Sequence, residues 1–192
     1  MLETRRPRVL LQSLGCKTNQ YENAALAAAF LAEGFLPAEP HHAVDVAVLN
    51  TCTVTGEAGR KSLQMLRRLR HHYPDAIVVA AGCHAQLTDL SGLADITVGT
   101  AGGAQIVQEV IKKLDDRTTQ PVSILDRFDY ETIAPVSIPS ETRAYIKIQD
   151  GCDNKCTYCA IRLARGPARS REPEAVVQEV RTLAAAGSAS LS

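Results

Sequence analysis

The sequence predicts an α/β protein, in which an amino-terminal parallel sheet is followed by the beginning of a second α/β domain. Between residues 8 and 99, short apolar runs alternate with segments of helical composition. Such alternation is typical of chains in which a helix connects each strand to a parallel neighbour. A cysteine follows each of the first three runs, and three further cysteines are clustered in residues 151–159. The 45% of apolar residues is enough for a substantial core.

The first domain is expected to span residues 1–114. Strands are predicted at the apolar runs that end at Cys16, Cys52 and Cys83, and at a fourth run, residues 94–99. Helices are predicted between these runs and after the last of them, over residues 19–34, 56–74 and 104–114. Gly34 and Pro74 suit the ends of the first two helices.

A linker is predicted at residues 115–140, where prolines are frequent and helix formers are few, with one short strand at residues 122–125. Residues 141–192 would then form the start of a second domain. They offer one strand over residues 144–149, the cysteine loop and one helix over residues 172–187. Glu172 and Glu174 suit the first turn of that helix.

Three cysteines in this second domain indicate a metal centre. Cys152, Cys156 and Cys159 have the spacing C-x3-C-x2-C, with no fourth cysteine or histidine close by. Three thiolates are one ligand too few for a closed tetrahedral zinc site or for a fully ligated iron–sulfur cube. One metal position would therefore stay open for chemistry. The alternative is a structural zinc loop completed by Cys83 or by one of the five histidines, His41, His42, His71, His72 and His84.

The other three cysteines are expected to form a second site. In a parallel sheet the carboxyl ends of the strands share one edge, where ligands characteristically bind. Cys16, Cys52 and Cys83 each follow a predicted strand and should converge there. Gly15 and Gly82 suit tight turns into the following helices, whose amino termini favour an anionic cluster. The alternative is three buried cysteines that act as small hydrophobic residues.

Four sequence blocks carry a resemblance to a known family. They are SLGCKTNQYENA, NTCTVTGEA, AAGCHAQ and IKIQDGCDNKCTYCAIRLARGPARSR. These blocks resemble those of the radical S-adenosylmethionine methylthiotransferases, and the match covers nearly the whole chain and all six cysteines. Lys17, Asn19 and Gln20, together with residues 53–55, resemble the branch that modifies N6-threonylcarbamoyladenosine beside the tRNA anticodon. Arg162 and Leu163 stand where the family usually has Pro-Tyr.

The resemblance implies a transferase with two 4Fe-4S clusters and S-adenosylmethionine. Cys152, Cys156 and Cys159 would hold the cluster that cleaves S-adenosylmethionine, while the auxiliary cluster, which carries the sulfur, would be held by Cys16, Cys52 and Cys83. Tyr158 would lie near the adenine, and Arg165 would meet the cofactor carboxylate or an RNA phosphate. Implied partners are tRNA as the substrate and an electron donor such as a flavodoxin or ferredoxin. The reaction would add a methylthio group to carbon 2 of the modified adenosine.

Two other functions stay open: a non-catalytic iron–sulfur or zinc-binding fragment, and a methylthiotransferase acting on a ribosomal protein. A complete (β/α)8 barrel needs about 250 residues, whereas only 48 follow residue 144. The tail, residues 187–192, also lacks the β-branched residues typical of a second barrel strand. We therefore expect a truncated chain that holds clusters without turning over.

Composition gives weaker guidance on partners and location. Basic and acidic residues are equal in number, at 21 each, so the net charge does not favour a polyanionic partner. Two local basic segments, residues 56–74 and 162–171, could contact RNA or be solvated surface. No stretch resembles a membrane span or a secretion signal, so a cytoplasmic location is expected. Reduced thiols are the rule in that compartment, which favours metal binding over disulfides.

Overall fold

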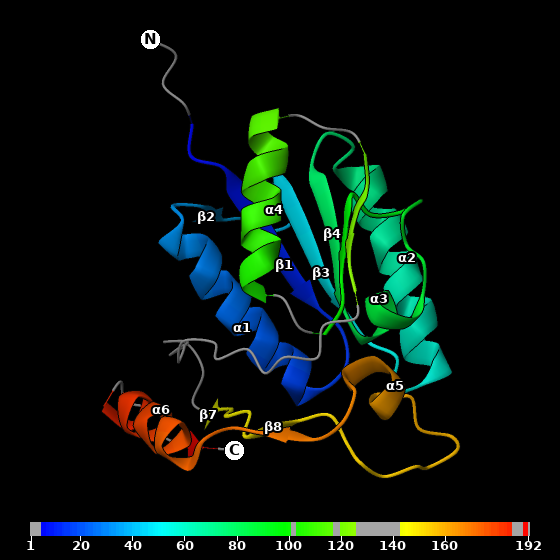
Figure 1. The fold of residues 1–192 in the computed structure, drawn as a ribbon. Coiled ribbons are helices and arrows are strands. Elements are labelled where there is room, and N and C mark those ends of the chain that lie inside the picture. The colour runs from blue at the N-terminus through cyan, green and yellow to red at the C-terminus, as the bar shows by residue number, and fades with distance from the viewer. Residues whose placement is uncertain (1–4, 101–102, 117–119, 126–142, 186–189, 192) are drawn as a thin grey trace.

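The computed structural model describes residues 5–100, 103–116, 120–125, 143–185 and 190–191, and its main feature is a six-stranded sheet (Figure 1). The strands are β1 (Arg8–Ser13), β2 (Leu36–Pro37), β3 (Val46–Thr51), β4 (Ile77–Gly82), β5 (Ile96–Val98) and β6 (Val122–Ile124). Their order is β2-β1-β3-β4-β5-β6, and every neighbouring pair is parallel. The predicted α/β class with an amino-terminal parallel sheet is confirmed.

Helices cover both faces of this sheet. The helices α1 (Lys17–Ala32) and α4 (Gly103–Asp116) pack on one face, and α2 (Gly56–His72) and α3 (Cys83–Leu87) pack on the other. Side chains of a strand alternate between the two faces, so the buried strand β3 sends Val46 and Val48 to the first core and Ala47 and Leu49 to the second. Strands buried on both faces are apolar throughout, which explains the apolar runs in the sequence.

The ends of the predicted helices agree with the local signals. Thr55 caps α2, because its Oγ1 accepts a hydrogen bond from the Ala58 amide at 3.1 Å. The helix ends at His72, two residues before Pro74, and Gly34 adopts a positive φ of 85° just after α1. Leu66 and Leu69 of α2 are buried, while its lysine and arginine side chains at positions 60, 61, 67 and 68 are exposed.

The second part of the chain contains short strands and two helices. These are β7 (Arg143–Ala144), β8 (Gln149–Asp150), α5 (Ile161–Arg165), β9 (Arg169–Ser170), α6 (Pro173–Ala185) and β10 (Ser190–Leu191). β8 pairs antiparallel with β9, whereas β10 pairs parallel with β7.

Three details of this part differ from the sequence-based expectation. The single strand predicted over residues 144–149 is split into β7 and β8, and residues 145–148 lie outside either strand. The tail, predicted to be unsuited to a strand, contributes β10. Two-residue pairing uses main-chain groups, so it does not require β-branched side chains. A short helix, α5, also forms within the arginine-rich segment.

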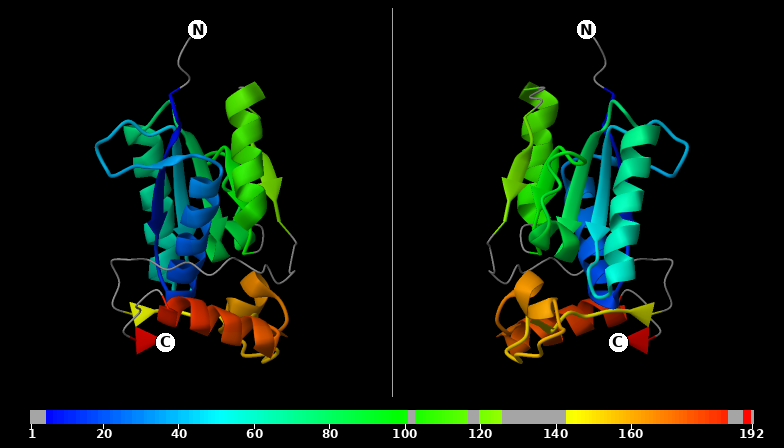
Figure 2. Two further views of the ribbon diagram at one scale, coloured as in Figure 1. Left: turned by 90° about the vertical axis from the view of Figure 1, so that its left-hand side faces the viewer. Right: turned by 90° about the vertical axis from the view of Figure 1, so that its right-hand side faces the viewer.

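The second part lies across the carboxyl ends of the sheet strands, below the loops that follow β1, β3 and β4 (Figure 2). The predicted linker includes β6, which pairs with β5 and so completes the sheet. Residues 117–119 and 126–140 of that linker lie outside the described residues, and the domain boundaries stay a prediction. None of the described helices is both long enough and apolar enough to cross a membrane.

Candidate metal centre

Cys16, Cys52 and Cys83 follow three adjacent strands, β1, β3 and β4. The helix after β1 packs on one face of the sheet, and the helix after β3 packs on the other. A change of face between neighbouring strands is a topological switch point, where open parallel sheets form ligand sites at the carboxyl ends of the strands. Cys16 and Cys52 therefore flank this switch point, and Cys83 is on the next strand along.

Two glycines allow the cysteine loops to pack tightly. Gly15 has a φ of 100°, and a Cβ atom there would lie 2.3 Å from the Sγ atom of Cys52. Gly82 has a φ of 89°, and a Cβ atom there would lie 2.2 Å from the Oδ1 atom of Asn50. Any other residue would meet both backbone strain and a steric clash at these positions. Because Gly15 has no side chain, the loop that contains Cys16 can lie against Cys52. Because Gly82 has none, the chain can turn there into α3, which begins at Cys83.

Asn19 joins the first two cysteine loops. Its side chain is fully buried, and its Nδ2 atom donates hydrogen bonds to the main-chain oxygens of Leu14 and Thr51, both at 2.9 Å. Its Oδ1 atom faces the Cys16 Sγ atom at 3.6 Å. One amide group therefore contacts the residue before the Gly15 turn, the residue before Cys52, and Cys16 itself.

Thr51 and Ser62 extend these contacts to the other side of the site. The Thr51 hydroxyl donates to the main-chain oxygen of Ala81 at 2.6 Å and accepts from the Ala85 amide at 3.1 Å. The Ser62 hydroxyl accepts a hydrogen bond from the Cys52 amide at 3.2 Å. The three cysteine loops are consequently linked by buried hydrogen bonds rather than by packing alone.

Burial and a nearby cation act in opposite directions on the Cys83 thiol. The side chain is 4% exposed, and this burial raises the pKa of its thiol to about 11. The Arg165 guanidinium opposes this rise, because a nearby cation favours the thiolate. A thiolate-bound cluster is anionic, so a fixed cation beside it supplies compensating charge.

The second set of cysteines lies in the loop between β8 and α5. Cys152 and Cys159 are partly buried and Cys156 is exposed. The Cys152 amide donates to the main-chain oxygen of Gly166 at 3.1 Å, so the loop closes on the end of α5. Tyr158 is 90% exposed and is thus open to a ligand that approaches from solvent.

The cysteines are free thiols, and in the described ranges no group of three or more histidine, cysteine or acidic side chains has a metal-holding arrangement. The donor chemistry of both sets nevertheless suits iron–sulfur clusters, because thiolates are soft ligands. The assignment of Cys16, Cys52, Cys83, Cys152, Cys156 and Cys159 as ligands stays a prediction.

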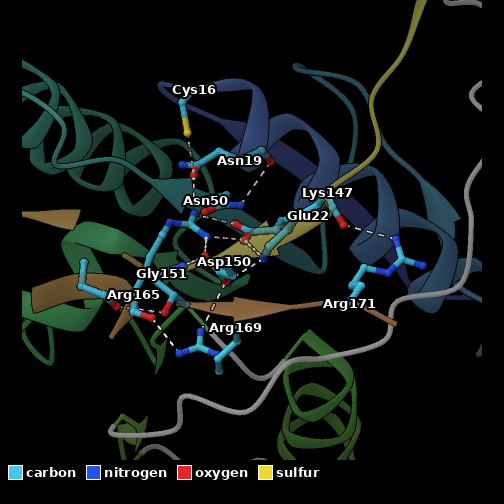
Figure 3. Close-up of polar contacts among 12 residues, drawn as sticks. Cys16, Asn19, Glu22, Asn50, Lys147, Asp150, Gly151, Arg165, Arg169 and Arg171 are labelled. Carbon is cyan, nitrogen blue, oxygen red and sulfur yellow. Dashed lines mark hydrogen bonds and ion pairs between the residues drawn. The ribbon is translucent and has the colours of Figure 1, made fainter. Parts of the chain in front are cut away.

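Arg165 is the centre of a buried group of charges (Figure 3). Its Nη1 atom donates to Glu22 at 2.7 Å and to Asp150 at 2.9 Å, and its Nη2 atom donates to Glu22 and to Asn19, both at 3.1 Å. Lys147 lies 2.8 Å from each of the same two carboxylates. We call Glu22, Lys147, Asp150 and Arg165 the ion cluster.

The ion cluster is charged at neutral pH. Burial by itself would raise the pKa of Glu22 and of Asp150, but Arg165 and Lys147 outweigh this effect and lower both values. Burial likewise opposes the charge of Lys147, but the two acids outweigh it and raise its pKa. Two cations therefore balance two anions away from water.

Sequence reasoning named Arg165 but missed its partners. The sequence predicted that Arg165 lies in a solvated loop or contacts a cofactor or RNA. In the structure its side chain is 7% exposed and pairs with Glu22 and Asp150. The one available signal was that Glu22 is the single acid in the sequence of α1. His84 directly follows Cys83 in the sequence. Its Nε2 atom is buried without a hydrogen-bond partner among the described residues, and burial lowers its pKa.

Two family models match different parts of this chain. Residues 8–98 match the Uncharacterized protein family UPF0004, and residues 146–191 match the Radical SAM superfamily. The second match covers the loop of Cys152, Cys156 and Cys159, so the part of the chain that follows the sheet is of the radical S-adenosylmethionine class. That class implies S-adenosylmethionine and a 4Fe-4S cluster as cofactors.

Curated relatives extend the match across both parts. The threonylcarbamoyladenosine tRNA methylthiotransferase MtaB of Bacillus subtilis is 36% identical over 187 residues, which cover 93% of this chain and 41% of the relative. The tRNA-2-methylthio-N(6)-dimethylallyladenosine synthase of Syntrophobacter fumaroxidans is 34% identical over 194 residues, covering 94% and 42%. The ribosomal protein uS12 methylthiotransferase RimO of Desulfitobacterium hafniense is 30% identical over 195 residues, covering 97% and 44%.

The chain therefore belongs by sequence to the radical S-adenosylmethionine methylthiotransferases, which are transferases, and the predicted family is confirmed. It spans less than half the length of these relatives.

Proposed function

We propose that this chain forms the cluster-binding part of a tRNA methylthiotransferase that adds a methylthio group to carbon 2 of N6-threonylcarbamoyladenosine. The observation that carries this proposal is the placement of Cys16, Cys52 and Cys83 after three adjacent strands at the switch point of the sheet, with the part of the chain that contains the second three-cysteine loop lying across the same edge (Figure 2). Relatives named for this tRNA substrate are 36% identical in Bacillus subtilis and 33% identical in Aquifex aeolicus.

Each set of cysteines has its own role in the proposal. Cys152, Cys156 and Cys159 hold one 4Fe-4S cluster, and Cys16, Cys52 and Cys83 hold the other. When bound, these groups supply the electron that cleaves S-adenosylmethionine and the sulfur that is transferred. The exposed ring of Tyr158 offers a surface for the adenine of the cofactor. Electrons come from a small redox protein such as a flavodoxin or ferredoxin.

Arg165 was predicted to contact the cofactor carboxylate or an RNA phosphate. Both of its Nη atoms contact Glu22, Asp150 or Asn19, so an incoming anion would have to displace one of these groups. We therefore propose that S-adenosylmethionine is bound mainly by the cysteine loop and Tyr158 rather than by Arg165.

Residues 1–192 by themselves are proposed to bind clusters without completing the reaction, because the relatives named as methylthiotransferases are matched over 39 to 45% of their length. Anaerobic reconstitution with iron and sulfide tests cluster binding, and two cubes predict about eight iron atoms per chain. Replacing either cysteine set with alanine should halve this number. Zinc binding with no retained iron would contradict the proposal.

The substrate branch and turnover need separate assays. Reduction with dithionite in the presence of S-adenosylmethionine should release no deoxyadenosine from the reconstituted chain, and release would contradict the proposed lack of turnover.

The substrate is tested by binding. Filter binding should favour tRNA carrying N6-threonylcarbamoyladenosine over the unmodified transcript and over ribosomal protein uS12. Preferential binding of uS12 would favour the second candidate function, which is motivated by the relative named for that protein.

A further inference from the structure

We propose that Arg165 is a positioning residue that holds the second cysteine loop in a fixed place against the first cysteine site. This inference deepens the proposed function and rests on it for the identity of the bound metal groups. The contacts themselves are between residues of this chain, so their effect can be measured with and without iron.

Arg165 closes the second cysteine loop at its base. Asp150 comes directly before the loop and Arg165 ends the helix directly after it. Their side chains are joined at 2.9 Å, and the main-chain bond from Cys152 to Gly166 runs beside this pair. The two ends of the loop are therefore held together by a buried ion pair and a hydrogen bond.

The same guanidinium also contacts the sheet domain. It donates to both carboxylate oxygens of Glu22, in α1, and to the Oδ1 atom of Asn19 one helical turn earlier. This Oδ1 atom also faces Cys16 Sγ. Arg165 and Cys16 thus share one acceptor atom, and the Nδ2 atom of that amide contacts Thr51, the residue before Cys52.

The charges of the ion cluster depend on one another. Buried ions are stable only when paired, so loss of Arg165 would leave Glu22 and Asp150 with Lys147 as their remaining cation in the ion cluster. A second contact, from the Thr100 hydroxyl to the main-chain oxygen of Ala164 at 2.9 Å, fixes α5 near the end of β5 but carries no charge. The contact through Arg165 reaches the first cysteine site, because Arg165 and Cys16 both donate to the Asn19 Oδ1 atom.

The test uses the full chain with Cys152, Cys156 and Cys159 replaced by alanine, so that only the first site can load a cluster. The variants Arg165→Gln and Arg165→Lys are compared with Arg162→Gln, which alters an exposed arginine of the same short helix. The electron paramagnetic resonance spectrum and the reduction potential of the cluster are measured. We expect Arg165→Gln to alter the spectrum and shift the potential to more negative values, Arg165→Lys to restore part of the potential, and Arg162→Gln to match the parent.

Hydrogen–deuterium exchange of the iron-free, unsubstituted chain provides the second readout. Arg165→Gln should speed exchange about tenfold in residues 150–166 and in the first turns of α1, whereas Arg162→Gln should not. If Arg165→Gln does not fold, both measurements are made on Arg165→Lys. This variant keeps the positive charge but lacks the forked guanidinium that contacts both Glu22 and Asn19.

The proposal is overturned if exchange or the cluster signature of a folded Arg165 variant equals that of the parent, or if Arg162→Gln has the same effect. A parent chain that binds no iron would contradict the proposed function instead, and the exchange measurement would then decide the role of Arg165 on its own.

Discussion

Arg165 donates hydrogen bonds to both carboxylate oxygens of Glu22, at 2.7 and 3.1 Å, although the two residues are 143 positions apart in the sequence. This pair connects the helix that follows the first predicted metal ligand with the helix that follows the last. It makes the edge of the sheet and the second cysteine loop parts of one buried polar network.

Substitution of Glu22 should destabilise the chain strongly. Glu22→Gln keeps the shape of the side chain but leaves Arg165 and Lys147 with Asp150 as their remaining acid in the ion cluster. Breaking a buried pair in this way is expected to cost about 3 kcal/mol of unfolding free energy. Urea denaturation followed by circular dichroism measures this, and Glu33→Gln, which alters an exposed acid just beyond the same helix, should change it by less than about 0.5 kcal/mol. Equal effects of the two changes would contradict the role of the pair.

The contribution of the ion cluster should disappear in acid. Glu22 and Asp150 have lowered pKa values in the folded chain, where Arg165, Lys147 and Arg169 face them. A lowered carboxyl pKa stabilises the fold above the unfolded value and loses its effect as the pH falls through the folded value. The stability difference between the parent and Glu22→Gln should thus be constant from about pH 5 to pH 8 and shrink below about pH 4. A difference that persists unchanged at pH 3 would show that packing, not charge, is responsible.

The strands and long helices of the sheet domain could be predicted because their signals are local. Apolar runs marked the strands, and Gly34 and Pro74 marked helix ends. The placement of Cys16, Cys52 and Cys83 after neighbouring strands could also be predicted, since strand ends of a parallel sheet share one edge, whereas their joint binding of a metal group stays a prediction.

The ion cluster could not be predicted in the same way. Glu22 and Arg165 are paired across a long sequence separation, and the one local signal, that Glu22 is the single acid of α1, does not identify its partner. The short elements α5 and β10 were missed for a related reason, because contacts with the rest of the chain, rather than sequence propensity, determine two- to five-residue elements.

Gly15 should tolerate no side chain. Gly15→Ala places a Cβ atom against Cys52 Sγ and forces a non-glycine residue to a φ of 100°. Together these effects should cost about 2 kcal/mol or more of unfolding free energy and lower iron retention at the first site. Gly92→Ala is the matched control, since its Cβ atom would meet nothing within 4 Å. A Gly15→Ala chain with parental stability and parental iron content would contradict the close approach of the two loops.

The cysteines should differ widely in reactivity when iron is absent. Cys156 is exposed, whereas Cys52 and Cys83 are 1% and 4% exposed. A pKa of about 11 for Cys83 also leaves on the order of 100-fold less thiolate at pH 7.5 than an ordinary thiol has, and the thiolate is the reactive form. Treatment of the reduced, iron-free chain with iodoacetamide, followed by peptide mass spectrometry, should therefore label Cys156 first and Cys83 last. Denaturation in urea should remove the difference, because burial is its cause. Labelling of Cys83 as fast as Cys156 in the folded chain would mean that the edge of the sheet is open to solvent, and that the second cysteine loop does not cover it.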